Sequence, residues 1–169
     1  MDTNFLPLTD LGRRDPGCCC PPFDPAQWDK LDLNFRDKLF VRVRTRSLFH
    51  IPLNMSAVFY RTWDAITAAG AEDNRFAILS NDESLWHADH YFTVTKAVPG
   101  LDTVTLSGSF VTRVFEGPYR DAYVWVREMR TDIGEMGRKM GQLYFYYTSC
   151  PRCAERRGRN YVVGIGEVL

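Results

Sequence analysis

The sequence has no excess charge of either sign and no long apolar run. Its 169 residues contain 21 Lys and Arg and 21 Asp and Glu, so no global field attracts a polyanion, and DNA or RNA is not expected as a direct partner. No stretch approaches the roughly 18 apolar residues of a membrane-spanning helix, and residues 1–17 lack the basic start and apolar core of a signal peptide. We therefore expect a cytoplasmic protein with no membrane partner.

Several catalytic signatures are absent as well. The chain has no glycine-rich nucleotide loop, no nucleophile elbow and no helical H-E-x-x-H, so these three common routes to catalysis receive no support. The stretch WHADHYF does hold His87, Asp89 and His90, but on a strand this spacing directs the two histidines to opposite faces. We therefore expect surface or turn roles for them rather than a metal site.

Cysteine is present in two clusters, Cys18 to Cys20 in GCCCPP and the C-x2-C pair Cys150 and Cys153. A reducing cytosol argues against disulfides. A C-x2-C on a tight hairpin suits one tetrahedral zinc ion, with two further ligands from the first cluster. Neighbouring cysteines fit poorly on one ion, so free buried cysteines are the alternative. A closed four-thiolate shell would be structural, so the reaction itself requires no cofactor.

Composition along the chain indicates an arm followed by one domain. Residues 1–37 are rich in proline, which forbids long helices and central strands there, while Phe23 and Trp28 suggest that this arm docks at least in part. Residues 38–169 contain regular patterns and are long enough to bury one sizeable core. We expect this second part to fold as one domain.

The regular part repeats one order of elements, strand, helix and two strands. The expected elements of the first unit are a strand from Leu39, a helix within 50–71 and strands within 75–82 and 85–98; those of the second are 101–115, 117–140, 143–150 and 160–168. An offset of 66 aligns Phe49 with Phe115 and Phe59 with Trp125. The pattern predicts an α+β fold, a duplicated β-α-β-β unit with two antiparallel sheets around a central ligand groove and helices on one side.

Aromatic residues gather on the elements that would face this groove. Most of them must serve the core, but buried tyrosine hydroxyls need partners, which favours an aromatic cavity with a polar edge. The residues that we expect to bind a ligand are Phe49, Trp63, Trp86, Tyr91, Phe115, Trp125, Tyr144 and Tyr146.

Glu116, at the end of a strand and before a helix, is the candidate general base. At the groove mouth it would orient a water molecule, with Tyr119 or His50, its counterpart in the first unit, as proton donor. The alternative is a carboxylate that only stabilises the positive end of a helix.

The stretch VFEGPYRDAYVWVREM, between a long strand and a helix, resembles the GyrI-like small-molecule-binding superfamily, in which a G-P-Y begins the second helix. The resemblance covers about residues 39–169. Together with CCPPFDP, KLFVRVRTRSLFHIPLN, SLW and YFYYTSCPRCA, it is similar to a stand-alone subgroup related to the cyclopropanoid cyclopropyl hydrolases. That family opens the cyclopropane of DNA-alkylating natural products such as yatakemycin inside an aromatic cage.

This resemblance implies a detoxifying hydrolase for a lipophilic aromatic small molecule, acting as a monomer or homodimer. Two other classes stay open: a binding protein that sequesters or senses such a molecule without chemistry, and an inhibitor of a larger enzyme such as gyrase. An enzyme needs a polar pair aimed into the cage, whereas a sequestering protein needs only its walls. Balanced charge gives the inhibitor little support.

Overall fold

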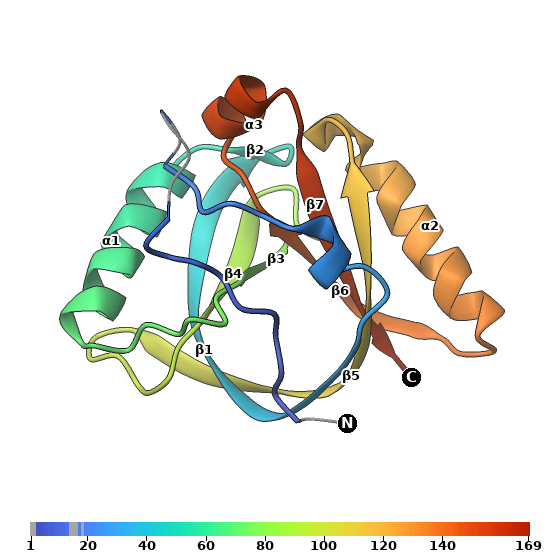
Figure 1. Cartoon of the computed structure of the whole chain (residues 1–169), viewed down its shortest axis with the longest axis horizontal. Coiled ribbons are helices and arrows are strands. Elements are labelled where there is room, and N and C mark those ends of the chain that lie inside the picture. The colour runs from blue at the N-terminus through green and yellow to red at the C-terminus, as the bar shows by residue number, and fades with distance from the viewer. Residues whose placement is uncertain (1–2, 14–16, 18) are drawn as a thin grey trace.

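Two long strands, β1 and β5, each begin one β-α-β-β unit in the computed structural model, which describes residues 3–13, 17 and 19–169 (Figure 1). The first unit consists of β1 (Asp32–Leu48), β2 (Ile51–Pro52), α1 (Met55–Ala68), β3 (Ile78–Asn81) and β4 (His87–Thr93). The second consists of β5 (Asp102–Glu116), η2 (Tyr119–Asp121), α2 (Ala122–Glu135), β6 (Met140–Tyr147), α3 (Pro151–Arg157) and β7 (Tyr161–Val168). The arm contains the short helix η1 (Pro25–Gln27). The α+β class and the predicted order of main elements are present, with β2 and α3 as additions.

The strands form one closed barrel, so the prediction of two sheets was wrong. Antiparallel neighbours run in the order β1, β4, β3, β6, β7 and β5, and β5 pairs back onto β1. Closure is possible because β1 and β5 are long: their pairing runs from Asp32 with Val111 to Arg42 with Asp102. The helices do not share one side, since α1 and α2 flank the barrel on opposite sides (Figure 1).

Each helix buries one stripe of residues spaced four apart. On α1 the stripe is Val58, Thr62 and Ile66, and on α2 it is Trp125, Met129 and Ile133. A glycine with positive φ follows each helix, Gly70 at 61° and Gly137 at 72°. The second helix therefore ends earlier than its period suggested: Met136 caps it, and Met140 begins β6.

The arm fills one end of the barrel interior, where the sequence predicted an open groove. Leu6 and Trp28 are buried in the same apolar cluster as the inward side chains of the strands. The rings of Trp28 and Tyr146 lie 5.2 Å apart, and a parallel bridge joins Thr3 to Asn34. The arm crosses in front of the barrel in Figure 1. Within the residues described, none of the helices is both long and apolar enough to cross a bilayer.

Candidate functional site

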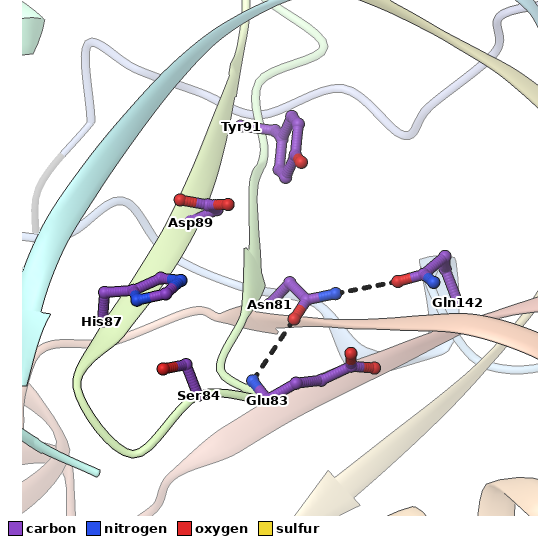
Figure 2. A pocket seen from close by; sticks show the side chains of 7 residues that line it. All are labelled: Asn81, Glu83, Ser84, His87, Asp89, Tyr91 and Gln142. Carbon is purple, nitrogen blue, oxygen red and sulfur yellow. Dashed lines mark hydrogen bonds between the residues drawn. The ribbon is translucent and has the colours of Figure 1, made fainter.

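A polar pocket of about 410 Å³ lies at the other end of the barrel interior. Three inward side chains along β6 show that the pocket and the arm lie at opposite ends of the barrel interior. Gln142 lines the pocket, Tyr144 packs on Tyr91 with ring centroids 5.5 Å apart, and Tyr146 packs on the arm. The pocket is lined by side chains of β3, the β3–β4 turn, β4 and β6: Asn81, Glu83, Ser84, His87, Asp89, Tyr91 and Gln142 (Figure 2).

Alternation along β4 supplies three of these side chains. His87, Asp89 and Tyr91 point to the pocket, while the residues between them face α1. His90 is buried under Phe59 of α1, with ring centroids 4.8 Å apart. The two histidines therefore lie on opposite faces, as the spacing predicted. The expected surface or turn role does not describe His87 and Asp89, which reach a pocket that exists only because β3 pairs with β6.

His90 is a core residue whose two ring nitrogens both have partners. Nε2 lies 2.8 Å from the Thr45 hydroxyl, and Nδ1 lies 2.7 Å from the Ser80 hydroxyl. Burial disfavours the charged imidazolium and lowers the pKa of His90 to about 4. This histidine is therefore neutral near pH 7 and is unavailable to a substrate.

Asp89 is held as a carboxylate by Arg44. The guanidinium donates hydrogen bonds of 2.7 Å and 3.1 Å to the two carboxylate oxygens, and these bonds lower the pKa of Asp89. A second set of bonds fixes the pocket wall: Asn81 Nδ2 donates to Gln142 Oε1 at 3.0 Å, and Asn81 Oδ1 accepts from the Glu83 backbone N–H at 3.3 Å (Figure 2). The negative charge of Asp89 is thus held in a defined position in this pocket.

The pocket can support acid–base chemistry on a bound molecule. Figure 2 shows the His87 imidazole, the Ser84 hydroxyl and the Asp89 carboxylate around one opening, with the Tyr91 ring beyond them. Imidazole is the side chain best suited to exchange protons near neutral pH. Behind Tyr91, burial raises the pKa of Tyr144 to about 12, so this inner hydroxyl stays protonated.

The three residues predicted to be catalytic lie elsewhere. Glu116 lines a second hollow of about 300 Å³, formed by the arm and the ends of β5 and β7. His50 Nδ1 lies 3.1 Å from Asp82 Oδ1. The Tyr119 hydroxyl donates to the backbone carbonyl of Ser149, and burial raises its pKa to about 12. Among the described contacts, none joins any two of these three predicted residues.

The predicted ligand-binding residues are distributed over four places. Tyr91 lines the polar pocket, and Tyr144 and Tyr146 lie in the barrel interior. The other pairs are Phe115 stacked on Trp125 beneath α2 at 5.5 Å, Trp63 against Phe76 beside α1 at 5.1 Å, and Phe49 against Trp86 at 5.4 Å on the surface. Trp63, Phe115 and Trp125 hold the helices to the barrel, as the core alternative states for these three rings.

Four cysteines from the two sequence clusters meet. The Sγ atoms of Cys19, Cys20, Cys150 and Cys153 all lie within 4.8 Å of one another, and this group could hold a metal ion. Cys18, the remaining candidate, lies outside the described residues. The C-x2-C pair lies at the start of the short helix α3 and not on the tight hairpin that was expected.

The thiols of this cluster differ in acidity. Burial opposes charge on Cys153, but backbone N–H groups of Cys20 and Cys19 donate to its sulfur and lower its pKa to about 6. Burial raises the pKa of Cys20 and of Cys19. The Cys153 thiol is therefore more acidic than those of Cys19 and Cys20.

Comparison with known proteins relates this chain to one family. The sequence model of a family described as bacterial hydrolase matches residues 12–168, which is nearly the whole chain. None of the curated proteins matches it.

Proposed function

Because the chain belongs to the bacterial hydrolase family, we propose that the pocket lined by His87 and Asp89 is where it adds water to a substrate. The observation that carries this proposal is the gathering of an imidazole, a fixed carboxylate and hydroxyls around one cavity of about 410 Å³. Such a set can orient a water molecule and move its proton.

The proposed roles follow from position and charge. His87 takes a proton from the attacking water. The Asp89 carboxylate, fixed by Arg44, favours the positive charge that His87 then acquires. The Tyr91 hydroxyl donates to the oxygen on which negative charge develops.

The substrate class that we propose is a cyclopropane joined to a conjugated dienone, as in yatakemycin-type natural products. Water attacks the cyclopropane carbon, a C–O bond forms and a ring C–C bond breaks. The electron pair moves to the dienone oxygen, which ends protonated as a phenol. The product is one water heavier and no longer alkylates. Since the rings in the described pocket lining are those of Tyr91 and His87, the pocket would hold the reacting head rather than a whole polycycle.

Purified protein incubated with a cyclopropane-bearing spirodienone tests this proposal. We expect loss of dienone absorbance over many turnovers, and a fall in kcat of roughly 10²- to 10⁴-fold in His87→Gln. Glu116→Gln tests, in the same assay, the general base predicted from the sequence. The hollow that Glu116 lines also holds Asp29 and Tyr161, so it too contains ionisable side chains. If His87→Gln kept full turnover and Glu116→Gln lost it, the reaction would have to take place in the second hollow.

A substrate failure can be separated from a site failure. If the dienone is bound but unchanged, a simple activated ester tests the pocket alone. Hydrolysis of the ester that depends on His87 would retain the site and reject the substrate class. Binding of the dienone with no hydrolysis of either compound would favour a sequestering protein.

For the four-cysteine group we propose a structural zinc ion with no part in the reaction. For the whole protein we propose action in the cytoplasm on a lipophilic aromatic small molecule, without direct contact to nucleic acid.

A further inference from the structure

The cysteine group joins two segments that are far apart in the sequence. Cys19 and Cys20 belong to the arm, whereas Cys150 and Cys153 belong to the start of α3. Cys19 Sγ lies 3.6 Å from both Cys150 Sγ and Cys153 Sγ, and 3.9 Å from Cys20 Sγ. Four sulfurs bound tetrahedrally at about 2.3 Å lie about 3.8 Å apart. These three distances are close to those of a tetrahedral thiolate shell, and all four sulfurs lie within 4.8 Å of one another.

Backbone hydrogen bonds cross between the two segments at the sulfurs. The Cys19 N–H donates to Cys153 Sγ at 3.3 Å, and the Cys150 N–H donates to Cys20 Sγ at 3.2 Å. N–H groups directed at sulfur favour the thiolate and orient it for a metal. Arg157 donates to the Cys20 carbonyl and to the Ser149 hydroxyl, both at 2.9 Å, which places a positive charge near a shell of net negative charge.

The arm has independent anchors on both sides of its cysteines. Before them, Thr9 donates its N–H to the Asn74 carbonyl at 2.7 Å and its hydroxyl to the Phe76 carbonyl at 2.9 Å. After them, Lys30 donates its N–H to the Thr112 carbonyl at 3.1 Å. Between Cys19 and Phe23, the cysteine group joins the segment to α3 together with hydrogen bonds from Arg157 to the Cys20 and Pro21 carbonyls.

Phe23 connects the cysteine group to the rings at one end of the barrel. Its ring lies 6.3 Å from Tyr146 and 5.8 Å from Tyr161, and Tyr161 lines the second hollow with Glu116. If this segment leaves its place, the Phe23 ring is removed from both tyrosines, while Trp28 stays packed on Tyr146. The position of Phe23 is thus linked to the shape of that hollow.

We propose that the zinc ion fastens residues 19–23 to α3 and thereby holds Phe23 over Tyr146 and Tyr161. This rests on the proposed structural zinc ion and adds its purpose, a staple for the middle of the arm. Binding replaces thiol protons by the metal, and no sulfur is oxidised. Both ends of the arm keep their own hydrogen bonds when the metal leaves.

Native mass spectrometry of the full chain, before and after chelation, tests the metal. We expect one zinc per chain, and thiolate-to-metal charge-transfer bands with tetrahedral visible bands after exchange to cobalt(II). Cys19→Ser, which removes the exposed ligand, is expected to lose the ion with the least risk to the fold. Cys18→Ser leaves all four sulfurs in place and is the matched control. A reduced chain that takes up neither zinc nor cobalt would overturn the metal proposal.

Hydrogen exchange on the same samples tests the staple. Chelation is expected to speed amide exchange at least about tenfold at Cys19, Cys20 and Phe23, the residues of this segment that carry an amide proton, and to leave residues 28–31 within about twofold. Cys19→Ser should show the fast pattern without chelator. Zinc that binds, but whose removal leaves exchange at 19–23 unchanged, would overturn the staple and retain the metal site.

Discussion

The two β-α-β-β units place different layers beneath their helices. Under α1, beside an apolar cluster that includes Ile66 and Phe92, lies a buried polar group, His90 between the hydroxyls of Thr45 and Ser80. Under α2 lies an apolar layer that contains Phe115 and Phe145 against Trp125. The same order of elements thus accommodates two different cores. The free energy of unfolding should depend on pH through the first core and on ring packing through the second.

The largest expected effect lies in the apolar layer. Trp125→Ala removes a side chain that is 4% exposed, is stacked on Phe115 and contacts Phe145. We expect a loss of about 3–5 kcal/mol in the free energy of unfolding. Phe59→Ala, at the position aligned by the offset of 66, should cost less because Phe59 is only partly buried. Urea unfolding of both variants checks this, and an equal or larger loss for Phe59→Ala would contradict the asymmetry.

The buried polar group at His90 should make stability fall in acid. The unfolded chain binds a proton at His90 near pH 6.5, whereas the folded chain binds it only near pH 4. The contribution of His90 is therefore complete above about pH 6.5 and is lost as the pH falls from 6.5 to about 4, by roughly 3 kcal/mol.

The matched variant for this effect is His90→Gln, which keeps hydrogen-bonding capacity but does not titrate. Carboxylates also titrate in this range, so the informative quantity is the difference in pH dependence between the wild type and His90→Gln. Unfolding measured at pH 7 and at pH 4.5 gives that difference. Identical pH dependence in both proteins would contradict the assignment.

The smallest effect concerns the close approach of α2 to β7. A Cβ at Gly166 would lie 2.8 Å from Ile133 Cδ1 and 2.9 Å from Met129 Cε. Gly166→Ala is therefore expected to cost about 1–3 kcal/mol. Gly134→Ala is the control, because a Cβ there meets nothing within 4 Å, and it should stabilise the exposed helix by up to about 1 kcal/mol. Thermal unfolding distinguishes the two signs.

The sequence was most informative where periodicity and glycine act locally. Alternation placed the strands, and Gly70 ended the first helix as predicted. The same local patterns could not reveal that β1 and β5 are long enough to pair and close the barrel. Nor did they indicate that the arm would fill one end of the interior with Trp28.

The site was harder to predict because it depends on contacts between distant strands. Asn81 and Gln142 meet only through the pairing of β3 with β6, and this contact turns His87 and Asp89 into pocket residues. The predicted aromatic cage rested on rings that a sequence cannot divide between core and ligand, and Trp125 and Trp63 belong to the core. The C-x2-C spacing predicted part of the cysteine group. That the neighbouring residues Cys19 and Cys20 both join this group is seen only in the folded chain.

Hydrolysis in heavy-oxygen water shows whether the pocket around His87 adds water to its substrate. Wild-type protein, His87→Gln and the exposed control Tyr123→Phe are each incubated with the spirodienone, and the product is weighed by mass spectrometry. We expect many turnovers with one heavy oxygen per product for the wild type and Tyr123→Phe, and a rate lower by roughly 10²-fold or more for His87→Gln. Equal rates for all three proteins would contradict it.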